Sequence, residues 1–439
     1  GQLFFGILIL NEFSPSFFRK ILGASILVLS PPMIFRAFGH NSLSAHWIIL
    51  AAIWFIILEY RNRLWRGAWV VLFFVAVLVN LYFVAMLIPL WGISLFIRYS
   101  RENHKWGLIL DLCSVIVVLL LLGYCLGFFS LKINNLSEIG FGYYSWNLNG
   151  LINPYTYSSI LNPMPLGLPE QYEGYSYLGL GNLVIFSVAF LLYFQNNYTS
   201  RHKKFLIPFV LVSILYILYS LSNKAFINDL RIWEIDLPAF VDTLCSALRS
   251  SGRFIWPVYY FIVLFGLISV NKNLKYSSPL LILAIVIQLI DIQPLYSEKT
   301  QNGFVDYHSP MQAEFWQAAA KTNKNIIILP ATKKAHSQYQ PIAMFAQQND
   351  MTLNWGYFAR ANYAAIEKDG EEIWEELLAD KVDYQTLYFL LSPELEAIVN
   401  NSHLENIIIC KVDGFDVALS TKNELFQNNI DPSRYCYMP

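Results

Sequence analysis

Two arginines lie four residues apart at the start of an apolar run, in the segment Arg249–Tyr260 (RSSGRFIWPVYY). A guanidinium binds phosphate through paired hydrogen bonds, and a helix N-terminus adds free N–H groups and a positive dipole. Another apolar run, residues 21–36, ends at Arg36, and the imidazole of His40 follows four residues later. We therefore interpret Arg36, His40, Arg249 and Arg253 as phosphate-binding residues. The alternatives are arginines that anchor a helix to lipid headgroups and an ordinary structural histidine.

The segment 131–176 combines aromatic residues with glycine, proline and asparagine. The latter three form turns, and aromatic rings with polar edges are suited to stacking on sugars. We predict this role for five rings: Tyr143, Tyr144, Trp146, Tyr172 and Tyr175. The alternative for each is a place in the aromatic belt at a membrane surface.

Glu173 is the carboxylate of this segment that lies closest to the apolar run at 177–195. A carboxylate in such a place acts as a general base, binds a metal, or accepts a hydrogen bond from a sugar hydroxyl. We interpret Glu173 as the candidate catalytic residue. The alternative is a solvated loop charge.

The amino-acid composition indicates the class of protein to which these residues belong. Only 14% of the 439 residues are charged, against about 25% in soluble proteins. Residues 1–300 hold 13 acidic and 20 basic residues, whereas residues 301–439 hold 18 and 10. The first part is therefore an apolar, basic membrane region and the second an acidic domain. Neither part has the dense basic stripe of a nucleic-acid-binding protein, so we predict no nucleic-acid partner.

Apolar runs of near-spanning length recur along the first 300 residues, as expected for a helical protein that crosses a lipid bilayer. They cover residues 2–11, 21–36, 46–60, 68–82, 83–97, 107–130, 177–195, 205–221, 254–270 and 279–295. The stretch from Gly67 to Ile97 is too long for one ordinary span, so we divide it near Asn80–Tyr82 into a hairpin of two short helices. The chain starts with Gly1 inside an apolar run, from which we expect an N-terminal truncation.

The distribution of Lys and Arg predicts which side each loop faces, because these residues are in excess on the cytoplasmic side. Short basic clusters lie at 19–20, 61–66, 98–105, 201–204 and 272–275. The remaining loops, 37–45, 131–176 and 222–252, are then external. We predict an α-helical polytopic membrane domain over residues 1–296 and a soluble α/β domain over 297–439 on the extracytoplasmic side.

The tail alternates helical and strand patterns, which is typical of an α/β domain. We predict helices at 309–322, 370–380 and 392–400, and strands at 325–329, 406–411 and 415–419. Cys410 and Cys436 could pair as a disulfide if the tail faces an oxidising compartment. The chain has no paired-cysteine or other metal-ligand spacing, so we predict no certain cofactor and leave a divalent metal open.

Three segments in this order resemble bacterial multi-pass proteins that are classed as GT-C-type glycosyltransferases. They are Gly140–Pro154 (GFGYYSWNLNGLINP), Tyr172–Gly181 (YEGYSYLGLG) and Arg249–Tyr260, with support from Pro31–His46 (PPMIFRAFGHNSLSAH). The resemblance covers about residues 20–295. It implies a GT-C-like helix bundle in the bacterial cytoplasmic (inner) membrane.

The resemblance also implies an activity: inverting transfer of a sugar from a polyprenyl-phosphate donor to an envelope glycan or glycolipid acceptor on the external face. It places an acidic catalytic residue in the first external loop, which would lie upstream of Gly1, and Glu173 would be its local substitute or helper. The competing functions are a lipid-linked glycan flippase and a polymerase, ligase or acyl-modifying enzyme of envelope glycan. A flippase needs charged groups deep within several spans, whereas this sequence places its charges at the ends of runs and in loops.

Overall fold

The computed structural model describes residues 1–37, 39–101, 106–128, 141–195, 200–274, 276–303, 307–332, 338–356, 363–401, 404–427 and 434–437. The chain forms two compact units that divide between residues 305 and 306. The predicted boundary after residue 296 instead falls inside helix α13 (Gln293–Gly303), which belongs to the first unit.

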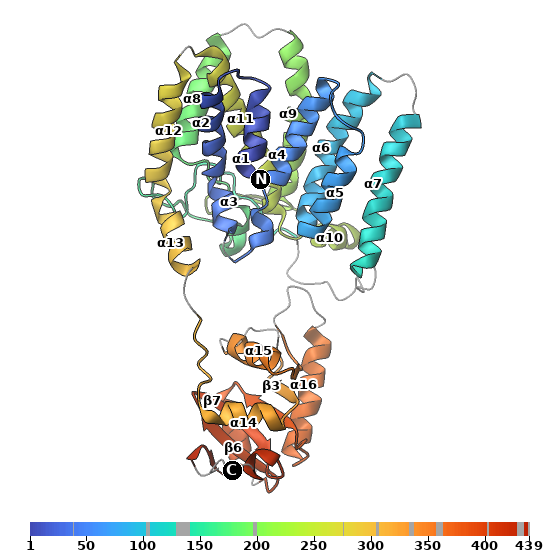
Figure 1. The fold of residues 1–439 in the computed structure, drawn as a ribbon, viewed down its shortest axis with the longest axis vertical. Coiled ribbons are helices and arrows are strands. Elements are labelled where there is room, and N and C mark those ends of the chain that lie inside the picture. Colours follow the sequence, from blue (N-terminus) through green and yellow to red (C-terminus); the bar gives the residue numbers. More distant parts are fainter. Residues whose placement is uncertain are drawn as a thin grey trace. The chain divides into compact units, whose positions relative to one another are not determined.

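The first unit is a bundle of apolar helices (Figure 1). Besides the polar helix α13, its longer helices are α1 (Gln2–Asn11), α2 (Phe17–Val28), α4 (Trp47–Tyr60), α5 (Ala68–Val79), α6 (Leu81–Tyr99), α7 (Trp106–Cys125), α8 (Leu180–Gln195), α9 (Ser200–Leu221), α11 (Trp256–Asn273) and α12 (Ser277–Asp291). The best-buried helices, α4 and α11, are apolar on almost every side, which is the composition of a helix surrounded by other helices or lipid.

The predicted hairpin between residues 67 and 97 is confirmed. A single extended residue, Asn80, separates α5 from α6, and its side chain accepts a hydrogen bond from the Tyr82 N–H at 3.1 Å. Trp69 at the start of α5 donates to Ser94 near the end of α6 (3.0 Å). The two helices are therefore antiparallel neighbours.

Fewer helices are long enough to cross a membrane than the ten apolar runs suggest. Among the described residues, four are long and apolar enough by length and composition, or five if one bent pair counts as a single span. The run at 21–36 breaks before Pro31, which starts the short helix α3 (Pro31–Arg36). The run at 279–295 is bent by 53° where α12 meets α13. Proline and polar residues inside apolar runs therefore divide several expected spans.

The short basic segments meet at one end of the bundle. Arg61 and Arg63 contact Glu12, and Lys272 lies 5.0 Å from the ring of Phe13. Arg101 pairs with Glu59 at the same end of α4. Segments that the sequence assigns to one side of a membrane are thus neighbours in space.

The predicted external loops contain regular structure that the sequence patterns did not reveal. Loop 222–252 holds the hairpin of β1 (Lys224–Ile227) and β2 (Leu230–Glu234), followed by α10 (Ala239–Ser246). The described part of loop 131–176 includes the 3₁₀ helix η4 (Pro169–Gly174). Asn147 ties the two loops together, because its side chain donates to the carbonyl of Asn228 at 2.7 Å.

The second unit is built on a six-stranded mixed sheet of order β4-β3-β5-β7-β6-β8. Its strands are β3 (Asn325–Leu329), β4 (Thr352–Leu353), β5 (Thr386–Leu390), β6 (Ile407–Val412), β7 (Phe415–Ser420) and β8 (Cys436–Tyr437). Alternate residues of β5 enter two separate hydrophobic cores, Leu387 and Phe389 on one face and Tyr388 and Leu390 on the other. Helices α14 (Glu314–Thr322) and α15 (Tyr339–Gln348) contribute to the first core, and α16 (Tyr363–Leu378) and α17 (Pro393–Asn401) to the second. This unit is therefore an α/β domain in three layers.

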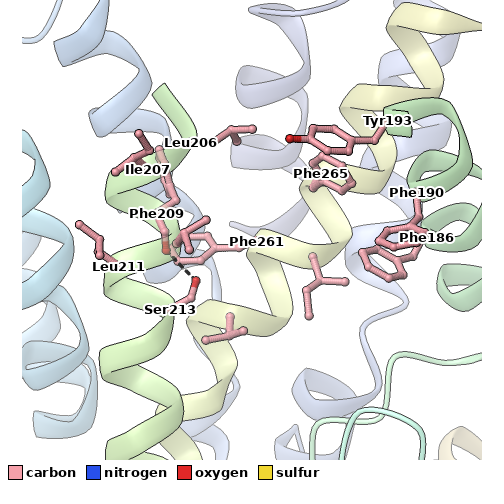
Figure 2. A pocket seen from close by; sticks show the side chains of 13 residues that line it. Phe186, Phe190, Tyr193, Leu206, Ile207, Phe209, Leu211, Ser213, Phe261 and Phe265 are labelled. Carbon is pink, nitrogen blue, oxygen red and sulfur yellow. Dashed lines mark hydrogen bonds between the residues drawn. The ribbon is translucent and has the colours of Figure 1, made fainter. Parts of the chain in front are cut away.

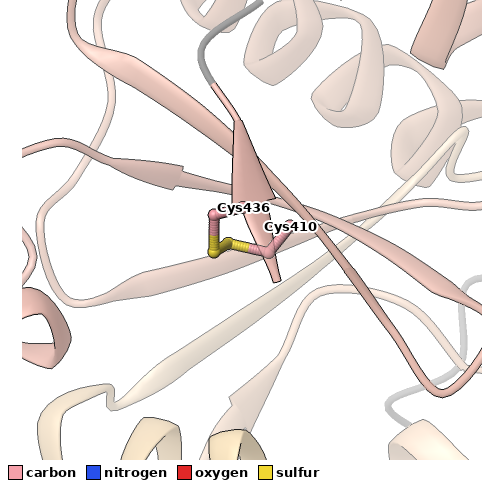
Figure 3. The surroundings of a disulfide bond; sticks show 2 residues. All are labelled: Cys410 and Cys436. Carbon is pink, nitrogen blue, oxygen red and sulfur yellow. A yellow bond between two sulfur atoms is a disulfide. The ribbon is translucent and has the colours of Figure 1, made fainter. Parts of the chain in front are cut away.

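The strand predicted at 325–329 coincides with β3, and those at 406–411 and 415–419 match β6 and β7 within one or two residues. The helix predicted at 309–322 begins only at Glu314. The Cys410–Cys436 disulfide joins β6 to the short strand β8 (Figure 3). The sequence patterns missed α15, β4, β5 and β8.

Candidate functional site

Three of the residues singled out from the sequence form one buried ion cluster, which we call the Glu173 cluster: Arg36, Glu173 and Arg253. The Nη2 atom of Arg36 lies 2.5 Å from Glu173 Oε2, and Arg253 donates to the same oxygen from Nε at 2.8 Å. The side chains of Arg36, Glu173 and Arg253 are 3%, 6% and 11% exposed, respectively. Two guanidinium groups therefore share one carboxylate oxygen, and the cluster carries a formal charge of one positive unit.

Two glycines make this meeting of distant segments possible. Glu173 precedes Gly174 in η4, and Arg253 follows Gly252 in the 3₁₀ helix η5 (Ser251–Ile255). A Cβ atom on Gly252 would lie 2.8 Å from the Cα of Gly174 and 2.9 Å from its nitrogen. Backbone atoms cannot move aside as a flexible side chain can, so only glycine permits this approach.

Aromatic rings surround both guanidinium groups. The Cζ atom of Arg253 lies 4.4 Å from the ring centre of Tyr82, and that of Arg36 lies 4.9 Å from the ring centre of Phe35. Such rings stabilise a partly desolvated cation through their electron-rich faces. The Nε atom of Arg36 is buried and has no hydrogen-bond partner among the described residues. The cluster therefore keeps positive charge and an unused donor.

The electrostatics do not suit Glu173 to the role of general base. Burial by itself raises the pKa of Glu173, but the nearby charges of Arg253 and Arg36 outweigh burial and hold the pKa below its ordinary value. A carboxylate stabilised in this way has little affinity for a proton at neutral pH. We therefore reinterpret Glu173 as a positioning residue that holds the two arginines together.

The other two predicted phosphate ligands lie apart from this contact. The guanidinium of Arg249 lies 5.4 Å from the ring centre of Tyr144. His40 keeps much of its surface in solvent, but partial desolvation of its imidazole and the charge of Arg36 lower its pKa. Its imidazole is therefore neutral at pH 7, so it offers a hydrogen bond to an anion but no positive charge.

The five predicted stacking rings divide into two groups. Trp146 and Tyr175 are 4% and 1% exposed, and each is held inside the fold. The Trp146 ring donates to Ser176, and Tyr175 packs against Tyr155 at 5.1 Å between ring centres. In this structure neither ring presents a face to a ligand, which corrects their predicted role. The outer group comprises Tyr143, Tyr144 and Tyr172, all at least partly exposed.

A cavity beside the Glu173 cluster is lined by rings of which the sequence singled out only Tyr172. Its volume is about 420 Å³, and we call it the aromatic pocket. Phe35, Tyr155, Tyr157 and Tyr172 supply its rings. Tyr172 and Phe35 are the chain neighbours of Glu173 and Arg36, so the pocket adjoins the cluster, although none of the three charged residues lines it. The string Asn153–Tyr157 within a Gly- and Pro-rich loop was the available signal for the missed rings.

A second cavity of about 610 Å³ is an apolar groove between α8, α9 and α11. Figure 2 shows Phe186 and Phe190 from α8, Phe209 from α9, and Phe261 and Phe265 from α11 around it. The groove follows α11 from Val258 to Phe265, roughly 10 Å at about 1.5 Å per residue. Its lining is almost entirely hydrocarbon, so it suits an apolar chain.

A second buried ion cluster, the Glu59 cluster, joins the ends of three helices. Arg98 of α6 contacts Glu59 of α4 and Asp111 of α7, each at 2.5 Å, and Arg101 also pairs with Glu59. These four side chains carry two positive and two negative charges. Within the described part of the chain, no group of three or more His, Cys, Asp and Glu side chains is placed to bind a metal ion.

Comparison with known proteins gives a family but no activity. The chain has no match among curated proteins or solved structures. The sequence model of a domain of unknown function (DUF6311) matches residues 1–293, and that of the DUF6311 C-terminal domain matches residues 315–420. These ranges follow the helical unit and the α/β unit closely. The chain therefore belongs to the DUF6311 family.

Proposed function

We propose that this protein is a membrane glycosyltransferase of the GT-C type, which transfers a sugar from a polyprenyl-phosphate donor to an envelope glycan or glycolipid. The observation that carries the proposal is the order of features along η5 and α11. Arg253 supplies charge at the start of this helical segment, and the apolar groove begins at Val258, one to two turns further on. A polyprenyl phosphate has the same order, an anionic head followed by a long hydrocarbon chain.

In the proposed reaction the acceptor hydroxyl attacks the anomeric carbon, and the bond from that carbon to the phosphate oxygen breaks. Negative charge grows on the departing polyprenyl phosphate, and stabilising it is the main electrostatic task of the site. Arg36 and Arg253 perform this task because their charges exceed that of Glu173. The proton of the acceptor goes to a carboxylate outside the Glu173 cluster, which the family resemblance places in the first external loop.

The proposed location is the bacterial inner membrane, with the Glu173 cluster and the second unit on the extracytoplasmic side. The gathering of basic segments at the opposite end of the bundle supports this orientation. The Cys410–Cys436 disulfide supports an oxidising environment for the second unit. In a cysteine-free background, Ser159→Cys should react with an impermeant thiol reagent in intact cells and Asn62→Cys should not; the reverse pattern would refute the orientation.

A flippase remains the main competitor, and the positions of the buried charges favour the transferase. Among the described residues, the buried charges lie at helix ends, in the Glu173 and Glu59 clusters and at Asp291. A protein that leads a polar headgroup across the bilayer needs such groups at intermediate depth. A transferase yields a glycosylated acceptor, whereas a flippase moves the lipid between leaflets unchanged. Assays of both products in the same preparation therefore distinguish the two functions.

The proposed function is tested first by donor binding. The purified chain in nanodiscs would be titrated with labelled polyprenyl phosphate, alone and carrying one hexose. Arg253→Ala should weaken binding by about 30-fold or more, since truncating one partner of a buried charged pair costs at least about 2 kcal/mol. Arg253→Lys should restore part of the affinity, because an ammonium keeps the charge but not the paired geometry.

Arg231→Ala is the matched control, because Arg231 is an arginine of the adjoining loop 222–252 with an exposed ion pair. It should bind as the wild type does. Equal affinity in the wild type and Arg253→Ala would exclude the cluster as the phosphate site. Movement of the labelled lipid between leaflets without a glycosylated product would instead identify a flippase.

A further inference from the structure

We propose that the aromatic pocket is a carbohydrate subsite, which in the proposed reaction holds the sugar ring bonded to the donor phosphate. The inference rests on the proposed function for the identity of its ligand, but the pocket is defined by its own geometry. The residues that build it are Phe35, Tyr155, Tyr157 and Tyr172, with Lys299 and Glu298 beside it.

The distance from the Glu173 cluster fits a sugar attached directly to a phosphate. The ring centre of Phe35, a wall of the pocket, lies 4.9 Å from the Cζ atom of Arg36. In a glycosyl phosphate only one oxygen separates the phosphorus from the sugar ring. The sugar of a phosphate bound by Arg36 is therefore within reach of Phe35 and of the cavity of about 420 Å³ that Phe35 lines.

The walls have the chemistry of a sugar site. Phe35 and three tyrosines supply flat apolar surface, and Thr156 adds a hydroxyl, so C–H faces and hydroxyl groups of a sugar both find partners. The backbone carbonyl of Gln171 accepts a hydrogen bond from the hydroxyl of Tyr155 at 3.1 Å, and this bond fixes the Tyr155 ring. Ligand pockets of this kind combine apolar walls with a few placed polar groups.

An ion pair on α13 supplies charged groups at the edge of the pocket. Lys299 Nζ lies 5.1 Å from the Phe35 ring centre and 5.8 Å from that of Tyr157, and it pairs with Glu298 at 3.0 Å. These groups are suited to reading the hydroxyl pattern of a sugar. They reach the pocket because the chain bends by 53° between α12 and α13.

Asp291, at the end of α12, connects this bend to the pocket loop. Its carboxylate accepts hydrogen bonds from Ser158, Tyr177 and the backbone N–H of Leu180, and it is fully buried. Ser158 directly follows the pocket residue Tyr157. One buried carboxylate therefore fixes the bend and the loop together, so the pocket is held open by the fold itself.

The experiment measures how much the sugar adds to donor binding. Polyprenyl phosphate would be compared with the same lipid carrying a hexose, an N-acetylhexosamine or a 6-deoxyhexose, in wild type, Tyr157→Ala and Tyr172→Ala. Each Ala variant should lose about three- to tenfold of the sugar-dependent affinity, the scale of one aromatic contact, and keep wild-type affinity for the bare lipid. Tyr157→Phe and Tyr172→Phe, which keep the rings, should retain most of it.

Saturation-transfer NMR with the methyl glycosides of the same sugars tests the pocket without the lipid. Binding that is lost in both Ala variants but kept in Tyr384→Ala, an exposed tyrosine of the second unit, supports the carbohydrate site. If bare polyprenyl phosphate fails to bind while glycoside binding depends on the pocket, the proposed donor is wrong and the carbohydrate site stands. A sugar contribution that is unchanged in both variants, or absent with every probe, overturns the inference.

Discussion

The Glu173 and Glu59 clusters are both buried and both join segments far apart in the chain, but their charge balance differs. The Glu59 cluster matches two arginines with two carboxylates across three helices. The Glu173 cluster matches two arginines with one carboxylate, in short 3₁₀ helices and at the end of α3. A buried cluster with balanced charge has its partners already and serves to hold helices together. A buried cluster with excess positive charge is suited to receive an anion.

The two clusters also differ in the volume of the cavity beside them. The cavity at the Glu59 cluster measures about 10 Å³, too small for a ligand. The Glu173 cluster instead adjoins the aromatic pocket of about 420 Å³. Charge excess and open volume therefore coincide at the Glu173 cluster, and charge balance and close packing at the Glu59 cluster.

The largest expected effect comes from breaking the balanced cluster. Arg98→Ala should lower the free energy of unfolding by about 3–5 kcal/mol, because it leaves Glu59 and Asp111 buried without their main partner. The measurement is denaturant unfolding in detergent, followed by donor titration of the folded fraction. Affinity per folded molecule should stay at the wild-type level. A loss of affinity without a loss of stability would reverse the roles that we assign to the two clusters.

Removing the shared carboxylate of the Glu173 cluster tests its role as a positioning residue. Glu173→Gln should cost up to about 3–5 kcal/mol of stability at pH 7, because two buried guanidinium groups lose their counter-charge. Because the pKa of Glu173 is lowered in the fold, its contribution is complete above the unfolded value of about 4.3. It is then lost as the pH falls from that value through the folded pKa.

The measurement for Glu173→Gln is unfolding stability of the variant and the wild type between pH 3 and pH 8. The stability difference should be constant above about pH 5 and shrink below about pH 4. Transfer activity should show the same acidic pH limb in both proteins if the base lies elsewhere, because a general base is lost when it is protonated. Disappearance of that limb in the variant would instead identify Glu173 as the base.

A smaller effect is expected from the glycine contact that brings the segments of the Glu173 cluster together. Gly252→Ala places a Cβ atom 2.8 Å from the Cα of Gly174, so the backbones must separate, at a cost of about 1–3 kcal/mol. Donor binding should fall as well, because Arg253 moves with Gly252. Gly92→Ala is the control, since nothing lies within 4 Å of the added carbon. Equal donor affinity in Gly252→Ala and Gly92→Ala would show that donor binding does not depend on the contact between Gly252 and Gly174.

The sequence predicted the parts of the molecule that depend on local pattern. A polar residue inside a long apolar run indicated the hairpin at Asn80, and a run of β-branched residues indicated β3. Arg36 and Arg253 were expected to meet only through one shared phosphate, and Glu173 was predicted separately as a catalytic residue. Their direct contact depends on two glycines more than 70 residues apart, and no local pattern encodes such a pairing. A repeated signal was nonetheless present, because two of the three charged residues have glycine beside them.

Burial was the property that the sequence could not supply for the aromatic loop. Trp146 and Tyr175 are aromatic residues of the same segment as Tyr144 and Tyr172, yet the first two are enclosed and Tyr172 is 41% exposed. The difference arises from packing against distant segments, since the Tyr175 ring lies in one hydrophobic cluster with Phe35, Ile292 and Leu295. The Trp256 ring donates to the carbonyl of Tyr175 at 3.2 Å, for example. Long-range packing of this kind decides which rings a ligand reaches.

The smallest effect is expected at a third site, where Arg61 and Arg63 contact Glu12 with the same charge count as the Glu173 cluster. Here the arginines are 40% and 58% exposed, so water already screens their charge. Arg61→Ala should change the free energy of unfolding by less than about 1 kcal/mol, with a further reduction in high salt. It should leave donor affinity unchanged. An effect on donor binding as large as that of Arg253→Ala would mean that charge excess alone governs binding, whereas a null result isolates burial beside an open pocket as the property that distinguishes the Glu173 cluster.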